Sequence, residues 1–371
     1  MSRYIWQDSA WPRFTWRAAE LADALAEGAF RQGHFLGKLS AIGFELRNQA
    51  GVEALSEEIV NSAAIEGEVL NRTDVRSSVA RKMEIATVEK GVESHTLDAR
   101  VEMILDATRG WDRPMSEDRL KSWHAALFPT GYSGLSKIAV ATYRDDAEGP
   151  MQVVSRRGSL LRTHFQAPAA ERIGHEMASL ITWLNGEMKE PMIVKAALAH
   201  LRFLTVHPFE DGNGRLARAL TEWVLARGEQ NALRFYSLSA EIQCEKDDYY
   251  AEIEHAQRNT LDVTRWIAWF AGCHARAIGA AEKTLGKILF KARFWRACQN
   301  SMLNANQRRM LNALLDGIDG NLTSSKWAKM CKVSQDTAGR EIDALVRAGI
   351  LVREGQGRST HYCIPNQSGI H

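Results

Sequence analysis

Apolar residues recur three and four positions apart along most of this chain of 371 residues. That spacing places them on one face of an α-helix. It predicts helices over residues 30–49, 103–111, 120–128, 170–185, 196–204 and 216–225. Since such segments outnumber the extended ones, we expect a mainly α fold.

Extended segments are short and few. Residues 149–155 give the clearest strand signal in the helical part of the chain, and a second extended run lies near 160–165. Together they predict a β-hairpin. Taken alone, these residues predict an ordinary surface hairpin, whose exposed edge could supply backbone hydrogen bonds to another extended segment.

The order of predicted elements changes near the C-terminus. Helices are expected over 307–315, 324–330 and 334–347, and extended runs over 350–353 and 360–364. This order resembles a winged helix-turn-helix. Residues 301–371 hold nine Lys and Arg against six Asp and Glu. That small excess leaves two uses open, a DNA partner or a protein partner.

These patterns divide the chain into four parts. We predict a helical N-terminal domain over 1–90, a helical core over 91–285, a helical connector over 286–303 and a winged-helix domain over 304–371. The length is sufficient for a sizeable core in each larger part.

Composition narrows the class of protein. The net charge of +2 gives no overall attraction to nucleic acid or to an anionic membrane. Five scattered cysteines without a Cys-x-x-Cys pair fit a reducing compartment and argue against structural zinc. No segment is apolar over about 18 residues, the length that a membrane span needs. We therefore expect a cytoplasmic protein with no membrane partner.

The segment His207–Arg218 reads HPFEDGNGRLAR and joins two predicted helices. Residues 211–214 combine two glycines, which tolerate positive φ, with two residues that favour turns. Successive N–H groups can then point into one concavity at the start of the next helix, where the helix dipole adds to the attraction for anions. Arg215 and Arg218 lie three apart, on one helix face. The residues predict a phosphate site.

Other interpretations of this segment are weaker. It could be a simple connection, with His207 as a core histidine. A calcium loop would use Asp211, Asn213 and Glu222, but an arginine stands at a ligand position and a leucine at the required glycine. The chain has no P-loop motif, so a triphosphate would have to be held by another device.

The segment matches HPFx(D/E)GNGRxxR, the signature of the Fic family, at every defined position, so the chain resembles Fic proteins. The resemblance implies a helical adenylyltransferase that transfers AMP from ATP to a Tyr, Thr or Ser hydroxyl of a target protein or of itself, with Mg²⁺. His207 would be the general base. Asp211 would hold Mg²⁺.

The remaining roles that the resemblance implies concern ATP and the target. The phosphates would be surrounded by Gly212, Asn213, Gly214, Arg215 and Arg218. The hairpin would be a flap that docks the target segment and contributes Val154 and Ser155 to the nucleotide site. Tyr249, Tyr250 and Gln257 would lie near the base, although glutamine replaces the more usual asparagine, and the two tyrosines could equally be packing residues.

The N-terminal part resembles the domain of unknown function that precedes Fic cores of this size. In it, residues 62–67 match the family's inhibitory motif, [S/T]xxxE[G/N]. Ser62 and Glu66 are four apart, on one helix face, and Gly67 allows a close approach or a kink. The resemblance implies that Glu66 restrains the enzyme by pairing with Arg218.

Three questions stay open in the sequence. The enzyme could remove AMP rather than add it, with Glu66 orienting a water molecule. The chain could instead be a transcription regulator, with a nucleotide-sensing core and a winged helix for output. A homodimer is also compatible with the sequence. Transfer of a phosphate group is disfavoured, because that branch of the family has lysine where this chain has Gly214.

Overall fold

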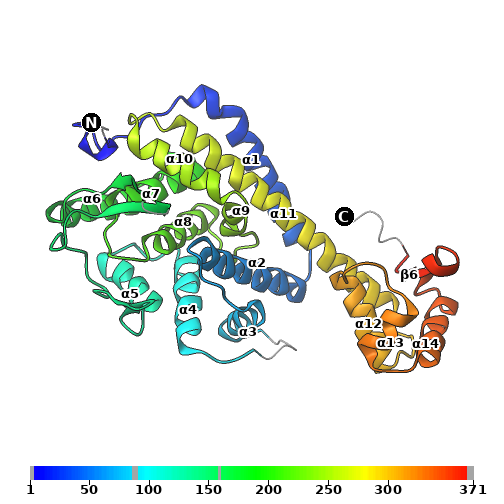
Figure 1. Cartoon of the computed structure of the whole chain (residues 1–371). Helices are drawn as coiled ribbons and strands as arrows, with labels where there is room; N and C mark the ends of the chain where they lie inside the picture. The colour runs from blue at the N-terminus through cyan, green and yellow to red at the C-terminus, as the bar shows by residue number, and fades with distance from the viewer. Residues whose placement is uncertain (1–3, 86–90, 158–159, 366–371) are drawn as a thin grey trace. The chain divides into compact units, whose positions relative to one another are not determined.

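The computed structural model describes residues 4–85, 91–157 and 160–365. Of residues 156, 157, 160, 161 and 358 it describes only the backbone. The chain forms two compact units, Met1–Ala281 and Glu282–His371 (Figure 1). Both are mainly helical, which confirms the predicted fold class. Within the described residues, no helix is long and apolar enough to cross a bilayer.

The first unit is built from helices of seven residues or more. They are α1 (Ala18–Ser40), α2 (Phe44–Ile65), α3 (Arg72–Lys82), α4 (His95–Arg109), α5 (Glu117–Leu127), α6 (Ile173–Asn185), α7 (Met192–Val206), α8 (Asn213–Glu229), α9 (Leu238–Cys244), α10 (Lys246–Arg258) and α11 (Thr264–Ala297), which continues into the second unit. Short 3₁₀ turns cover Ile5–Gln7 and Ala170–Arg172. The N-terminal helices therefore belong to the same unit as the motif, and the predicted boundary near residue 90 stays a prediction.

One predicted helix was wrong in its bounds. The apolar spacing suggested a helix over 30–49, but α1 ends at Ser40 and α2 starts at Phe44. Gly43 stands between them with extended backbone, φ −61° and ψ 154°. Glycine is a poor helix former, so the chain can turn there at little cost. The spacing did not reveal the break because both helices bury apolar residues.

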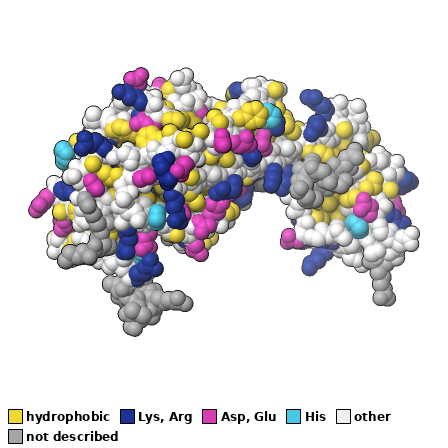
Figure 2. All heavy atoms as spheres, turned by 90° about the horizontal axis from the view of Figure 1, so that it is seen from above, with side chains coloured by type: hydrophobic (Ala, Val, Ile, Leu, Met, Phe, Trp, Pro, Cys, Tyr) yellow, Lys and Arg dark blue, Asp and Glu magenta, His cyan; other side chains and the backbone are white. Residues whose placement is uncertain are grey.

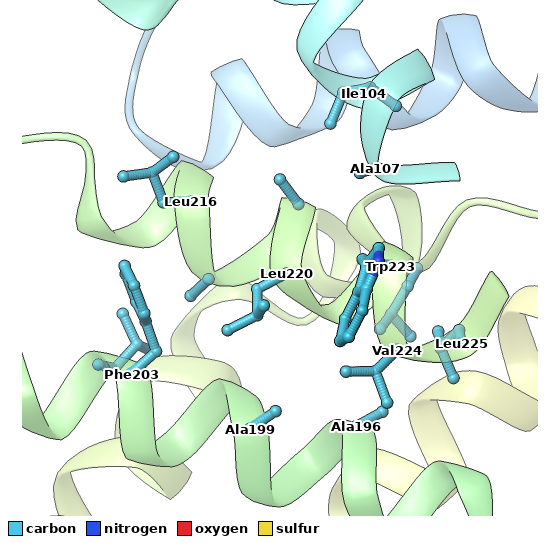
Figure 3. Close-up of a cluster of buried hydrophobic side chains, with 14 of the residues drawn as sticks. Ile104, Ala107, Ala196, Ala199, Phe203, Leu216, Leu220, Trp223, Val224 and Leu225 are labelled. Atoms are coloured by element: carbon cyan, nitrogen blue, oxygen red, sulfur yellow. The ribbon is translucent and has the colours of Figure 1, made fainter. Parts of the chain in front are cut away.

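Helices α7 and α8 form the centre of the first unit. Every residue of α7 from Val194 to Val206 is buried. Small residues of α7, among them Ala196 and Ala199, allow α8 to approach closely, and the side chains of Leu220, Trp223 and Val224 point from α8 toward them (Figure 3). A helix that is buried on all sides is a rigid support. These two helices hold the motif loop between them.

Helix α2, with the predicted inhibitory residues at its end, is anchored by a buried carboxylate. Glu58 accepts hydrogen bonds from the Ser237 hydroxyl at 2.8 Å, the Ser239 N–H at 2.9 Å and the Ser239 hydroxyl. These donors satisfy a charge that would otherwise be costly to bury. The end of α2 is thereby fixed relative to α9.

The predicted β-hairpin is present as β3 (Gln152–Arg157) and β4 (Leu160–Gln166). The strands are antiparallel, and the register shifts between Val153 and Val154, which marks a β-bulge. A smaller hairpin, β1 (Tyr132–Ser133) and β2 (Ser136–Lys137), lies earlier in the chain.

The second unit shows the predicted order of a winged helix. Helices α12 (Ala305–Asp316), α13 (Ser324–Cys331) and α14 (Gln335–Arg347) are followed by the antiparallel pair β5 (Val352–Glu354) and β6 (His361–Cys363). Its core is its own, with Met310, Trp327 and Ile342 fully buried. On the face that Figure 2 shows, Lys and Arg side chains are interspersed with Asp and Glu rather than gathered in one patch.

Candidate active site

The motif loop begins with a strained residue. His207 ends α7 with left-handed backbone, φ 50° and ψ 61°, and its N–H donates to the Phe203 carbonyl at 2.9 Å. The loop is closed by Asn213, whose side chain accepts from the Phe209 N–H at 3.0 Å and donates to the Phe209 carbonyl at 2.7 Å. The Asn213 side chain therefore shapes the loop, and only its backbone N–H is left to face an anion.

Helix α8 starts without a side-chain cap. Its N-cap is Gly212, with φ 81° and ψ 0°. A Cβ at this position would lie 2.8 Å from Cε2 of Phe128, so glycine is required by space as well as by conformation. The N–H groups of a first helical turn have no partner inside the helix. An uncapped N-terminus of this kind can bind an anion.

The imidazole of His207 is oriented by one backbone contact. Its Nδ1 lies 3.3 Å from the Leu204 carbonyl oxygen. Because a carbonyl can only accept, Nδ1 carries the proton and Nε2 keeps a free lone pair. Burial lowers the pKa of His207 to about 4. The ring is therefore neutral at pH 7 and able to accept a proton at Nε2.

Arg218 is buried and only partly satisfied. Its Nε donates to the Ser62 hydroxyl at 2.9 Å, and its Nη2 donates to the Ser62 carbonyl at 2.9 Å and to Glu66 Oε1 at 2.8 Å. Its Nη1 is buried without a hydrogen-bond partner. A buried donor without an acceptor is unfavourable, so this N–H is available for a ligand oxygen.

The carboxylate of Glu66 lies against the first turn of α8. A Cβ at Gly214 would overlap Glu66 Oε1. The carboxylate thus occupies the place where an anion would meet the helix N-terminus and Arg218 together. Gly67 follows with φ 81°, and the Glu68 N–H returns to the Ala63 carbonyl at 3.0 Å.

Glu68 contacts the other signature arginine, which sequence reasoning missed. Its Oε2 lies 3.4 Å from Arg215 Nη1, and its Oε1 accepts from Arg100 Nη1 at 2.5 Å. Arg215 also lies 3.8 Å from Asp211 Oδ1, its guanidinium lies over the Phe128 ring, and its Nε is buried without a partner. The sequence feature that could have revealed this contact is a second glutamate, two residues after Glu66 and just past Gly67, whose backbone is left-handed.

Asp211 has the exposure that a metal ligand needs. Its side chain is 44% exposed, and its Oδ2 accepts from the Ser133 hydroxyl. Among the described residues, no group of three or more His, Cys, Asp or Glu is close enough to hold a metal. A Mg²⁺ ion here would therefore depend on Asp211 together with phosphate and water oxygens, which is its usual mode with nucleotides.

The residues predicted near the base separate into two environments. Tyr249 is buried, and its hydroxyl lies 2.8 Å from His200 Nε2. Gln257 is also buried, with Nε2 3.4 Å from the Thr205 hydroxyl. Tyr250 is 44% exposed and donates to the Ile65 carbonyl at 3.3 Å, beside Glu66. Of the three, Tyr250 has the surface nearest the motif that a ligand could reach.

The hairpin is held on one side by α10. Arg258 donates to the Thr163 carbonyl at 2.6 Å and to the His164 carbonyl at 2.7 Å, both in β4. Val154 and Ser155 are exposed on β3, and the Ser155 hydroxyl lies 2.6 Å from His164 Nε2. Helix α10 thus covers β4, and β3 forms the other edge of the hairpin.

Three protein-family models match separate parts of the chain. The model described as Fic/DOC family matches residues 114–225. A domain of unknown function, DUF4172, matches residues 4–85. The C-terminal domain of a DIP2311-like transcriptional regulator matches residues 308–364.

Among curated proteins, the chain is 33% identical over 129 residues to protein adenylyltransferase fic-1 of Caenorhabditis briggsae, with 34% of this chain and 24% of the relative covered. It is 26% identical over 236 residues to protein adenylyltransferase Fic of Nematostella vectensis, with 62% and 49% covered. The chain therefore spans about a quarter to a half of the length of these relatives.

Among solved structures, a Fic family protein from Desulfovibrio desulfuricans G20 aligns with a TM-score of 0.55 at 19% identity, covering 96% of this chain and 98% of that chain. A Fic domain containing signaling protein from Bacteroides thetaiotaomicron aligns with a TM-score of 0.52 at 21% identity, covering 70% and 97%. At these identities the similarity is one of fold.

Proposed function

The chain is a Fic-family protein, and we propose that it transfers AMP from ATP to a hydroxyl group of a protein. The observation that supports this most is that groups able to bind an anion and a group able to accept a proton lie together at the start of α8. The uncapped helix N-terminus, the unpartnered Nη1 of Arg218 and the free Nε2 of His207 belong to one loop and the helix turns beside it. Anion donors and a general base are the groups that nucleotidyl transfer requires.

Phosphate oxygens are the acceptors that these donors lack. A buried unsatisfied donor costs about 1–3 kcal/mol, and both Arg218 Nη1 and Arg215 Nε are in that state. We assign them, with the first-turn N–H groups of α8, to the phosphates of ATP. Mg²⁺ held at Asp211 would supply further neutralisation of phosphate charge.

The chemical step is attack of a hydroxyl oxygen on the α-phosphorus of ATP. A new oxygen–phosphorus bond forms, the bond from the α-phosphorus to the bridging oxygen breaks, and diphosphate leaves. His207 Nε2 takes the hydroxyl proton, which it can do because the ring is neutral near pH 7. The target segment would pair with the outer edge of β3, where backbone groups give affinity with little demand on sequence.

Glu66 restrains the transfer in this proposal. Its carboxylate replaces a phosphate oxygen at Arg218 and at the first turn of α8. To hold the competent state at about one per cent takes roughly 2.7 kcal/mol. A single charge-assisted hydrogen bond contributes about 1.5–3 kcal/mol, so one carboxylate is sufficient in magnitude. Glu68 adds a weaker contact to Arg215.

The decisive experiment compares two labels. The full-length chain carrying Glu66→Gly is incubated with Mg²⁺ and ATP labelled either at the α or at the γ phosphate. Label should enter protein from the α position and not from the γ position, and mass spectrometry should find AMP on a hydroxyl side chain. Incorporation of γ label would replace adenylylation with phosphorylation. Absence of both labels, on this chain and on added cell protein, would reject the proposal.

For the second unit, the surface of α14 favours a protein partner over DNA. Its exposed residues include Asp336 and Asp343 beside Arg340 and Arg347, so acidic and basic charges are equal in number there. A recognition helix in the major groove lies close to phosphates, where acids are repelled. Gel retardation of the full-length chain on mixed DNA at low salt should show no shifted band, and a shifted band would restore the regulator alternative.

A further inference from the structure

The backbone of His207 is in a conformation that its surroundings must maintain. At φ 50° and ψ 61° it lies in the left-handed region, which is unfavourable for a residue with a side chain. The contact from Nδ1 to the Leu204 carbonyl depends on that conformation, because a right-handed residue would continue α7 and turn the ring elsewhere. Such strain persists only where other contacts oppose its release.

Arg144 makes those contacts. Its side-chain Nε donates to the His207 carbonyl at 2.8 Å, and its backbone N–H donates to the Pro208 carbonyl at 2.9 Å. One residue therefore holds the two carbonyls that follow the strained backbone. Arg144 is 4% exposed, so these hydrogen bonds are made in a dry environment where they are strong.

The other end of the guanidinium reaches the root of the hairpin. Its Nη2 donates to the Pro168 carbonyl at 2.6 Å, and its Nη1 pairs with Asp146 at 2.8 Å. Asp146 also accepts from the Ala170 N–H at 2.7 Å. Pro168 and Ala170 lie two and four residues past the end of β4 at Gln166. The three nitrogens thus join the motif loop to the hairpin, a geometry that the single ammonium of lysine cannot reproduce.

We infer that Arg144 is a positioning residue for His207, fixing the left-handed backbone that orients the imidazole and joining the motif loop to the base of the hairpin. The acceptors of these Arg144 hydrogen bonds are the His207, Pro208 and Pro168 carbonyls and Asp146, and none of them belongs to α8. Loss of Arg144 should therefore impair turnover and leave nucleotide affinity unchanged. The inference about turnover rests on the proposed function, whereas the inference about the ring does not.

The test uses the full-length chain with Glu66→Gly as parent and adds Arg144→Lys. Misplacement of a reacting group by about 1 Å can cost on the order of 100-fold in rate, so we expect kcat to fall by roughly 10- to 100-fold while the Kd for a non-hydrolysable ATP analogue stays within about 2-fold. Arg144→Ala should regain part of its rate with added ethylguanidinium.

A matched control is Arg119→Lys. Arg119 is also a largely buried arginine that donates from several nitrogens, to Asp106 and to the Gly110 carbonyl, but it lies on α5. It should lower the melting temperature without changing kcat. If Arg144→Lys loses analogue binding in parallel with turnover, or keeps full turnover, Arg144 is a structural residue and the inference is wrong.

Nitrogen NMR of His207 separates this inference from the proposed function. In the parent, the ring should show the tautomer with the proton on Nδ1, because of the Leu204 carbonyl. In Arg144→Lys the tautomers should mix. An unchanged His207 signal would overturn the inference even if the parent transfers no AMP. A parent without transfer whose tautomer does change would reject the function and keep the positioning role.

Discussion

Glu66 Oε1 accepts a hydrogen bond from Arg218 Nη2 at 2.8 Å, although the two residues are 152 positions apart in the chain. The arginine is almost fully buried, and its side chain is also held by Ser62. Glu66 is fixed at the end of α2, and Arg218 lies in the first turns of α8. A residue at the end of a helix from the N-terminal part of the chain therefore binds one of the two arginines to which we assign the phosphates of ATP.

The first prediction is that Glu66→Gly raises self-labelling with AMP. Removal of the carboxylate frees Arg218 Nη2 and the space above Gly214 for a phosphate oxygen. Loss of a contact that contributes about 1.5–3 kcal/mol corresponds to roughly 10- to 100-fold in the population of the competent state. The measurement is the rate of incorporation from ATP labelled at the α phosphate.

Two variants control this experiment. Arg218→Ala should not activate, because it removes the partner of Glu66 together with a phosphate ligand. The double variant Glu66→Gly/His207→Ala should bind ATP but label itself about 10²- to 10⁴-fold more slowly than Glu66→Gly. Should Glu66→Gly label itself no faster than the wild type, Glu66 is not the restraint and the end of α2 is ordinary packing.

The second prediction concerns Glu68. Glu68→Gln keeps the shape of the side chain but removes the charge that faces Arg215 and Arg100. Since Glu68 is 36% exposed and exposed pairs contribute about 0.2–1 kcal/mol, ATP should bind about 2- to 5-fold more tightly. Calorimetric titration in the Glu66→Gly background would measure this. Glu57→Gln, on α2, is the control, because its partner Arg72 is not part of the site. Weaker ATP binding by Glu68→Gln would mean that Glu68 orients Arg215 toward the phosphates.

The third prediction is a pH profile. The pKa of His207 is lowered by burial to about 4, and a general base is active when it is neutral. Titration of His207 should therefore leave the rate of AMP transfer by Glu66→Gly unchanged between pH 6 and 8. With an ordinary histidine pKa near 6.5, the rate would fall as pH drops through that value. His207→Ala should lower the single-turnover rate about 10²- to 10⁴-fold. A profile that halves near pH 6.5 and loses that step in His207→Ala would show that burial does not set the pKa of the base.

Local chemistry in the motif explains how far sequence reasoning reached. The turn at 211–214 and the uncapped start of α8 follow from glycine and from residues that favour turns. The direction of the Asn213 side chain could not be predicted from the sequence, because an amide can either face a ligand or close its own loop. In the structure it binds the Phe209 backbone. The contacts of Arg144 and Glu68 join segments far apart in the chain, and no periodicity encodes them.

The tyrosine pair shows the same limit. Successive residues on a helix point about 100° apart, so one of two neighbours faces the core while the other faces outward. Tyr249 is the buried one because His200 and Arg218 lie beneath α10. The predicted helical connector, 286–303, overlaps the last part of α11 (Thr264–Ala297), and its bounds as a separate part of the chain stay a prediction. Three glycines spaced along that helix lower its propensity without breaking it.

The last prediction concerns stability, through two buried histidines that the chemistry does not use. His200 lies between the Thr221 hydroxyl at 2.9 Å and the Tyr249 hydroxyl at 2.8 Å. His274 lies 2.9 Å from the Tyr236 hydroxyl. Burial lowers the pKa of each to about 3. In the unfolded chain each would titrate near 6.5.

The sign follows from these values. Between about pH 3 and 6.5 the unfolded chain binds more protons than the folded chain, so stability is present above the unfolded pKa and is lost as pH falls through this window. From pH 7 to pH 5 each of the two histidines should lower the free energy of unfolding by about 2 kcal/mol. Urea unfolding followed by tryptophan fluorescence at both pH values gives the difference in the free energy of unfolding.

His274→Phe should shrink that difference by about 2 kcal/mol, whatever its effect on stability at pH 7, because contributions from carboxylates cancel between variant and wild type. His175→Gln, at an exposed histidine, is the control and should leave it unchanged. An equal difference in wild type and His274→Phe would mean that His274 is accessible to protons in the folded chain.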